Sequence, residues 1–171
     1  ICPTSGTINE YCRGYGKTMT VNIGPRGFVS DAVLEGTILN EGWLSNITVK
    51  AEATVKGGVV TGYVTNQGMM SDFNFVGAKL TGGTLSGNIT NSSNIGGTFV
   101  DVTLAPNAHL RGGYLQGTIK GDKNAPALLD NLYVLAGSHL SGVTLGKNVT
   151  LAVGSTVADV TLTANAYLNG G

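Results

Sequence analysis

The chain has 171 residues, of which 12% are charged, and its ten acidic and ten basic side chains cancel. This balance excludes a basic surface for nucleic acid and an acidic solvating tail. No apolar segment is long enough to span a membrane, and no signal-peptide pattern opens the chain. The 27 glycines and the many Thr, Asn, Ser and Val residues favour short strands joined by tight turns. We therefore predict an all-β chain.

Residues 1–20 are predicted to form an irregular N-terminal cap. Both cysteines, Cys2 and Cys12, lie in this segment, and their spacing fits no zinc-binding pattern. We expect them to form a disulfide, which contributes about 2.8 kcal/mol in the chain-entropy model. A disulfide favours an oxidising compartment outside the cytoplasm. A metal or redox pair is the alternative interpretation of the two cysteines.

Residues 21–171 repeat one pattern, and its period of roughly 25–30 residues is typical of a solenoid. Each repeat contains a run of alternating apolar residues around an Asx residue, and a glycine follows the run. The runs begin at Leu44, Met70, Phe99, Leu129 and Val157, with one residue deleted in the second. The repeat therefore predicts a rod built from one stacked unit.

Each repeat is interpreted as one coil of that rod. The coils are assigned to residues 31–56, 57–81, 82–111, 112–141 and 142–169. Each coil is expected to open at a corner of positive φ, where glycine is favoured. These corner residues are Asp31, Gly57, Gly82, Gly112 and Gly142, and Gly170 begins a coil that is not completed.

Three short strands with inward apolar residues are expected in each coil. The first strand carries an inward glycine, and the set is Gly36, Gly62, Gly87 and Gly117. The second strand carries an inward apolar row of Ile47, Phe73, Val102, Leu132 and Val160. Longer segments at 91–97 and 121–126 are expected to bulge from one edge of the rod.

The fold predicted from these features is a parallel β-helix of about six coils. Left-handed β-helices are built from hexapeptide sides, three to a coil, and the intervals in this chain are longer than such a coil. The right-handed form is therefore predicted, and right-handed crossovers are also the favoured ones between parallel strands.

One outward column of the predicted rod contains both histidines, His109 and His139, together with Lys79. Arg111 belongs to the column beside it. The functional interpretation is a metal pair, or a groove that grips an anionic polysaccharide as in β-helix lyases. The alternative is a solvent-exposed column without a role. No acidic residue recurs beside the histidines to complete an acid/base pair or a metal site, so we expect no catalytic residues.

The Asx residues form the most regular polar column, and its carboxylates are the candidate Ca²⁺ ligands Asp72, Asp101 and Asp159. The nonapeptide of calcium-binding β-rolls is absent. We therefore expect these side chains to hydrogen-bond corner backbone groups, and we expect no metal or other cofactor.

Two further outward features point to other ligands. Trp43 could stack on a sugar ring. A row of Thr48, Thr103 and Thr161, interrupted by Asn74 and Tyr133, is similar to the threonine rows of ice-binding solenoids.

Residues 21–171 resemble the Gly/Asn/Thr/Val-rich repeats of bacterial surface and secreted proteins. Autotransporter passengers and filamentous haemagglutinin-like adhesins are the nearest types. The resemblance implies a right-handed β-helix, a location outside the cell or on its surface, and a role in adhesion or surface structure.

The predicted function is a non-enzymatic structural or adhesive module. We expect it to be a fragment of a longer repeat protein or a unit of a fibre. Its partners would be other chains, bound through open strand edges, or carbohydrate on a cell surface, with no nucleic acid. A polysaccharide-active enzyme and an ice-binding solenoid are the alternatives.

Overall fold

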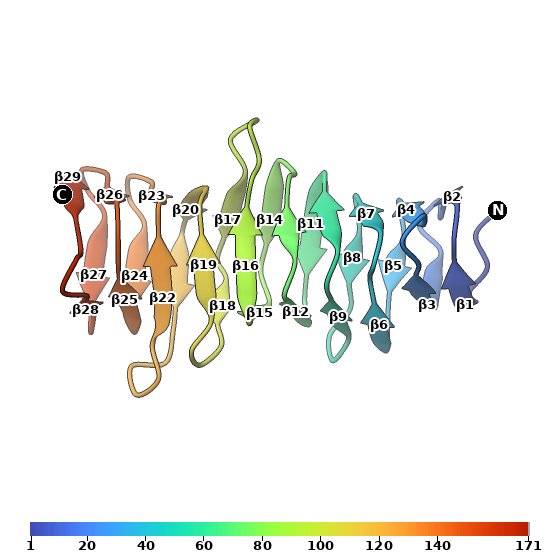
Figure 1. Ribbon diagram of the computed structural model, residues 1–171, viewed down its shortest axis with the longest axis horizontal. Coiled ribbons are helices and arrows are strands. Elements are labelled where there is room, and N and C mark those ends of the chain that lie inside the picture. The colour runs from blue at the N-terminus through green and yellow to red at the C-terminus, as the bar shows by residue number, and fades with distance from the viewer. Residues whose placement is uncertain (171) are drawn as a thin grey trace.

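The computed structural model describes residues 1–170, which form strands and no helix. The strands build three parallel sheets that run side by side along a rod (Figure 1). The described residues accordingly contain no helix that could cross a membrane.

We call the three sheets I, II and III in the order in which the chain passes through them within one coil from β4 onward. Sheet I contains β2 (Tyr11–Arg13), β4 (Phe28–Ser30), β7 (Trp43–Ser45), β10 (Val59–Thr61), β13 (Asn74–Phe75), β16 (Asn88–Asn91), β19 (His109–Arg111), β22 (Ala127–Asp130), β25 (Val143–Leu145) and β28 (Thr161–Leu162). Sheet II contains β1 (Ser5–Ile8), β3 (Thr18–Ile23), β5 (Val33–Leu34), β8 (Thr48–Val49), β11 (Tyr63–Asn66), β14 (Lys79–Thr81), β17 (Thr98–Val100), β20 (Tyr114–Gln116), β23 (Tyr133–Val134), β26 (Val149–Leu151) and β29 (Leu168–Gly170). Sheet III contains β6 (Thr37–Leu39), β9 (Thr54–Lys56), β12 (Met69–Ser71), β15 (Thr84–Ser86), β18 (Thr103–Leu104), β21 (Thr118–Lys120), β24 (His139–Ser141) and β27 (Thr156–Ala158).

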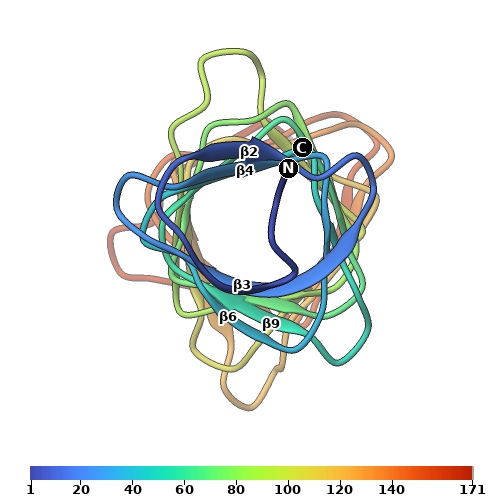
Figure 2. The ribbon, with the colours of Figure 1, turned by 90° about the vertical axis from the view of Figure 1, so that its right-hand side faces the viewer.

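One coil of the solenoid consists of one strand from each sheet. Residues that pair between successive coils, such as Phe28 with Trp43 or Asn88 with His109, are closer in sequence than one repeat of the apolar-Asx run. The described chain therefore makes about ten coils, and the predicted six longer coils are wrong. Figure 2 shows the chain turning clockwise as it recedes from its N-terminal end, so the solenoid is right-handed. The predicted right-handed sense is confirmed. The observed coils are too short, however, to support the argument from coil length on which that prediction partly depended.

The sequence repeat and the structural coil differ because they contain different numbers of strands. The recurring run lies in β7, β12, β17, β22 and β27, so one repeat spans five strands. A coil spans three strands, and one repeat therefore covers one and two-thirds coils. Successive copies of the run lie on sheets I, III, II, I and III in turn.

The core of the rod is the stack of inward apolar side chains. In the predicted inward row Ile47, Phe73, Val102 and Leu132 are buried, and Val160 is partly buried. These residues lie at corners between strands and not within one strand as predicted, and successive members do not stack directly because their corners join different pairs of sheets. Each fully buried aliphatic side chain stabilises the fold by about 1.5–3 kcal/mol, so the stack supplies most of the cohesion between coils.

The four glycines predicted to face inward within a strand instead lie at corners between strands. Gly36, Gly62, Gly87 and Gly117 have φ between +72° and +81°, a region that other residues rarely adopt. The inward-strand prediction was wrong because each apolar-x-Gly-x-apolar segment is two short strands on two sheets, such as β5 and β6 on either side of Gly36. The period-two alternation of side chains continues across the corner and hides it.

The residues assigned as coil openings from Asp31 to Gly142 also lie at corners, whereas Gly170 is the last residue of β29. Gly57, Gly82, Gly112, Gly142 and Gly170 all have positive φ, and Asp31 has a φ of +53°. An Asp is tolerated in this conformation because its short polar side chain can hydrogen-bond locally.

The N-terminal segment continues the sheets. β1 and β2 lie within residues 1–20 and pair with β3 and β4, so half of this expected irregular cap is regular strand. Cys2 and Cys12 form a disulfide with a Cα–Cα distance of 5.3 Å, and both side chains are buried. The disulfide ties the first residues of the chain to β2.

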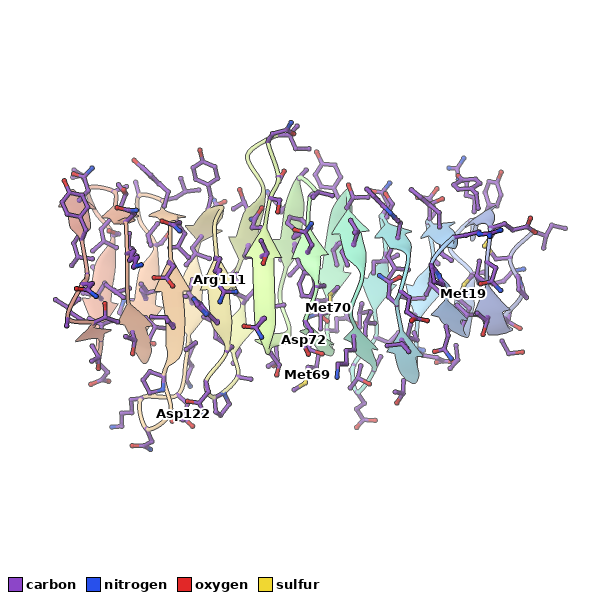
Figure 3. All side chains as sticks on the ribbon, in the orientation of Figure 1. Met19, Met69, Met70, Asp72, Arg111 and Asp122 are labelled. Carbon is purple, nitrogen blue, oxygen red and sulfur yellow. A yellow bond between two sulfur atoms is a disulfide. The ribbon has the colours of Figure 1, made fainter. Side chains whose placement is uncertain are left out.

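The two insert loops leave the rod at different edges. The 91–97 loop connects sheet I to sheet II, whereas the 121–126 loop connects sheet III to sheet I. Figure 1 shows them at the upper and lower edges, and Figure 3 places Asp122 on the lower loop. The prediction that both bulge from one edge is wrong, because it assumed one repeat per coil.

Candidate functional site

The four residues of the lyase-like hypothesis do not share one face. His109 and Arg111 lie in β19 on sheet I, where Figure 3 shows Arg111. Lys79 lies in β14 on sheet II, and His139 lies in β24 on sheet III. The predicted column with adjacent histidines is therefore wrong. The structure does not assemble these residues into a single groove.

His109 has a different partner, Asp130 of the next coil. The His109 Nε2 atom lies 2.6 Å from the Asp130 Oδ2 atom, and both side chains are largely buried. The Lys147 backbone N–H donates to the other oxygen, Asp130 Oδ1, at 2.7 Å. Burial opposes ionisation of this carboxylate, but the hydrogen bonds from Lys147 and His109 together lower the pKa of Asp130. The pair joins two coils of sheet I.

The predicted Asx column is spread over the corners. Asp72 and Asp159 lie between sheets III and I, far apart along the rod, and Asp101 lies between sheets II and III. Within residues 1–170 no group of three His, Cys, Asp or Glu side chains could hold a metal ion.

Three members of this column, Asn46, Asp72 and Asp101, bind the backbone of the next coil. Asp72 Oδ1 accepts a hydrogen bond from the Asn88 N–H at 2.9 Å, and Asp101 Oδ1 accepts one from the Thr118 N–H at 2.8 Å. Each bond lies beside a corner glycine of the next coil, where a Cβ atom would overlap the Asx oxygen. The glycine in each contact is the one in the apolar-x-Gly-x-apolar segment, Gly87 above Asp72 and Gly117 above Asp101, so this glycine and the Asx residue are two halves of one contact.

The threonine row predicted for ice binding is also dispersed. Thr48, Thr103 and Thr161 lie on sheets II, III and I. The register places a different outward column on sheet II, formed by Thr18, Val33, Thr48, Thr65, Thr81 and Val100. Glu35 and Lys50 form an ion pair beside this column. The column of Thr and Val side chains is therefore not continued by a second such column on that side.

Trp43 belongs to an aromatic surface that the sequence did not indicate. Tyr11, Phe28 and Trp43 are register partners on three successive coils of sheet I, in β2, β4 and β7. The ring centroids of Tyr11 and Phe28 are 5.3 Å apart, and those of Phe28 and Trp43 are 6.1 Å apart. The last two rings are parallel within 6°. We call these three residues the aromatic ladder.

The ladder is open to solvent and polar along its side. Tyr11 is 62% exposed and Trp43 is 43% exposed, while Phe28 between them is half-buried. The Tyr11 hydroxyl lies 3.2 Å from the Ser30 hydroxyl. The arrangement offers a row of three neighbouring aromatic rings along the rod, with the Tyr11 and Ser30 hydroxyl groups beside it.

A charged pair adjoins the ladder. Arg13 and Asp31 form an ion pair, and Arg13 also lies 4.6 Å from the centroid of the Tyr15 ring. The hydrogen bond with Asp31 and its negative charge raise the pKa of Arg13. The guanidinium group therefore stays protonated, and its positive charge is balanced by the Asp31 carboxylate.

The ladder residues follow one another in sequence at the interval of one coil, from Tyr11 to Phe28 and from Phe28 to Trp43. A search for aromatic residues at that interval would have found the ladder. The longer sequence repeat hid it, because that repeat compares residues on different sheets.

No family model, curated protein or solved structure matches the chain.

Proposed function

We propose that the protein is a non-enzymatic adhesive module of a secreted or cell-surface protein, and that it binds an extended neutral polysaccharide through the aromatic ladder. The carrying observation is the row of Tyr11, Phe28 and Trp43 on three successive coils, in which Tyr11 is tilted against Phe28 and Phe28 is stacked with Trp43. The buried disulfide supports a compartment outside the cytoplasm. The resemblance to bacterial surface repeats supports the same location.

The ladder suits a sugar chain by its shape. The apolar faces of pyranose rings pack on aromatic rings, and burial contributes about 25 cal/mol for each Å² of apolar area removed from water. Coils follow one another at a spacing of about 4.8 Å, which is similar to the length of one sugar unit in an extended chain. A polysaccharide that runs along the rod axis would therefore place successive sugar rings over successive ladder residues.

The charges around the ladder favour a neutral ligand. Arg13 and Asp31 are paired with each other. At the corner preceding the ladder strands, Glu10, Arg26 and Glu41 alternate in sign from coil to coil. An anionic polymer would gain little from such a surface, because neighbouring charges of opposite sign cancel beyond a few ångströms.

Fluorescence of Trp43 tests the proposal directly, since this is the single tryptophan of the chain. The protein is titrated with cellohexaose, chitohexaose and polygalacturonate. We expect a saturable change in emission with at least one of the neutral oligosaccharides and none with polygalacturonate. No change with any neutral oligosaccharide would contradict the proposal.

Two variants separate the ladder from exposed aromatic residues in general. Tyr11→Ala removes one of the three ladder rings and should weaken binding by about three- to tenfold. Tyr63→Ala is the matched control, because Tyr63 is 67% exposed but lies on sheet II. Equal losses of affinity in the two variants would show that the ladder has no special role.

A further inference from the structure

An open cavity of about 460 Å³ lies on sheet II, distant along the rod from the aromatic ladder. It extends over β20, β23 and β26, near the C-terminal end in Figure 1. Its lining consists of Ser93, Gly113, Tyr114, Asn131, Leu132, Tyr133, Asn148 and Thr150. None of these residue types is charged at neutral pH, and the set combines aromatic rings with amides and hydroxyls.

Two tyrosines form the apolar part of the cavity. Tyr114 and Tyr133 are register partners on adjacent coils, and their ring centroids are 5.7 Å apart with an angle of 55° between the planes. They are 38% and 39% exposed. The two tilted rings form a concave apolar corner in which a sugar ring could pack against both.

Two corner asparagines form the polar part. Asn131 and Asn148 both have a φ of +53° and occupy the corner between sheets I and II. The Asn148 Nδ2 group donates to Asn131 Oδ1 at 3.1 Å. This bond fixes both amides, and within residues 1–170 it leaves Asn131 Nδ2 as a donor and Asn148 Oδ1 as an acceptor for a ligand. A donor beside an acceptor complements the hydroxyl groups of a saccharide.

The 91–97 loop supplies a wall that is held in place. Ser93 donates its hydroxyl to the Gly77 carbonyl at 2.7 Å, and its N–H donates to Asn91 Oδ1 at 3.2 Å. Asn91 is buried and also donates to the Gly97 carbonyl at 3.1 Å. The loop is therefore anchored to the rod at Ser93, the loop residue that lines the cavity. The loop forms one wall of the cavity beside sheet II.

We propose that this cavity, the tyrosine groove, is a second binding site and takes a short neutral saccharide. Aromatic faces with a few fixed polar groups are the usual composition of ligand sites. The site does not depend on the ladder, since it lies on another sheet and several coils away. It contains no tryptophan, so its occupancy is not reported by Trp43.

The test uses the Trp43→Ala variant of the full chain, so that the ladder is impaired. Cellotriose, triacetylchitotriose and trigalacturonate are titrated while the tyrosine ring signals are followed by NMR. We expect saturable shifts in Tyr114 and Tyr133 with at least one neutral trisaccharide and none with trigalacturonate. Absence of shifts with both neutral sugars, or equal shifts with trigalacturonate, would overturn the proposal.

Two substitutions assign the binding to the groove. Tyr133→Ala should weaken binding by about tenfold. Asn131→Asp removes the free donor but keeps the corner, because Asp72 and Asp101 have a similar positive φ at equivalent corners. It should also weaken binding, while Tyr63→Ala on the same sheet should not. Unchanged affinity in both groove variants would overturn the proposal even if the tyrosine signals move, and it would leave the ladder proposal unaffected.

Discussion

Replacing Gly117 with alanine tests the contact between corner glycine and Asx that joins the coils. Gly117 has a φ of +81°, and a Cβ atom there would overlap the Asp101 side chain of the preceding coil. Asp101 would have to move, which breaks its 2.8 Å hydrogen bond from the Thr118 N–H. Gly137 is the matched control, because it lies in a turn between the same two sheets with a φ of +78° and has open space around it.

The expected losses differ because only one substitution creates a clash. An alanine held in the left-handed region costs about 1–2 kcal/mol, and this is the whole expected effect of Gly137→Ala. Gly117→Ala adds the loss of a hydrogen bond to a charged acceptor, about 1.5 kcal/mol. The free energy of unfolding should therefore fall by about 3 kcal/mol in Gly117→Ala, roughly twice the loss in Gly137→Ala.

Urea unfolding followed by far-UV circular dichroism measures both losses. Removing the Asp101 side chain should relieve the overlap, so Asp101→Ala combined with Gly117→Ala should cost less than the two changes separately. Equal losses in Gly117→Ala and Gly137→Ala, together with additive effects in the double variant, would refute a stabilising role for the contact.

Three further changes should alter stability in defined ways. Asp130→Asn should cost about 1 kcal/mol at pH 7. Because the pKa of Asp130 is lowered in the folded state, its contribution is present above about pH 4 and is lost as pH falls through the folded pKa, so the variant should show a weaker decline in urea stability below pH 4. Asn66→Ala should cost about 2 kcal/mol in urea unfolding, since Asn66 is buried and the Gly68 N–H loses it as an acceptor. Replacing Cys2 and Cys12 with serine should lower the midpoint of thermal unfolding by removing about 2–3 kcal/mol.

The sequence predicted the class of fold because burial and corner geometry leave clear patterns. Ile47, Val102 and Leu132 are buried as expected, since most inward positions of a parallel solenoid carry an apolar side chain. The disulfide followed from two cysteines in one short segment.

The coil length could not be predicted from the repeat, because the three sides of the solenoid are physically similar. An Asx side chain at a corner can pack beside a glycine of the next coil whichever two sheets the corner joins, as at Asn46 and Gly62 or at Asp101 and Gly117. The sequence pattern therefore recurs at every fifth strand, where the same type of corner returns. The chain returns to the same sheet at every third strand. Every outward column inferred from the longer interval combined residues of different sheets, such as His109 and His139.

The residues of the two candidate sites come together only through the strand register of the short coil. Trp43 was identifiable as an exposed aromatic residue, but Tyr11 and Phe28 align with it only when the coil is shorter than the sequence repeat. Tyr133 interrupts the threonine row in the longer repeat, yet in the structure it pairs with Tyr114. In both cases the sequence contains the residues, and the register brings them together.

Co-sedimentation with insoluble neutral polysaccharide tests the proposed adhesive function most directly. Native protein, a variant with Tyr11, Phe28 and Trp43 all replaced by alanine, and Tyr63→Ala are mixed with microcrystalline cellulose and with chitin. Native protein and Tyr63→Ala should sediment with at least one polymer, and the triple variant, shown to be folded by circular dichroism, should stay in solution. Native protein that stays in solution with both polymers, or a triple variant that sediments equally well, would contradict the proposal.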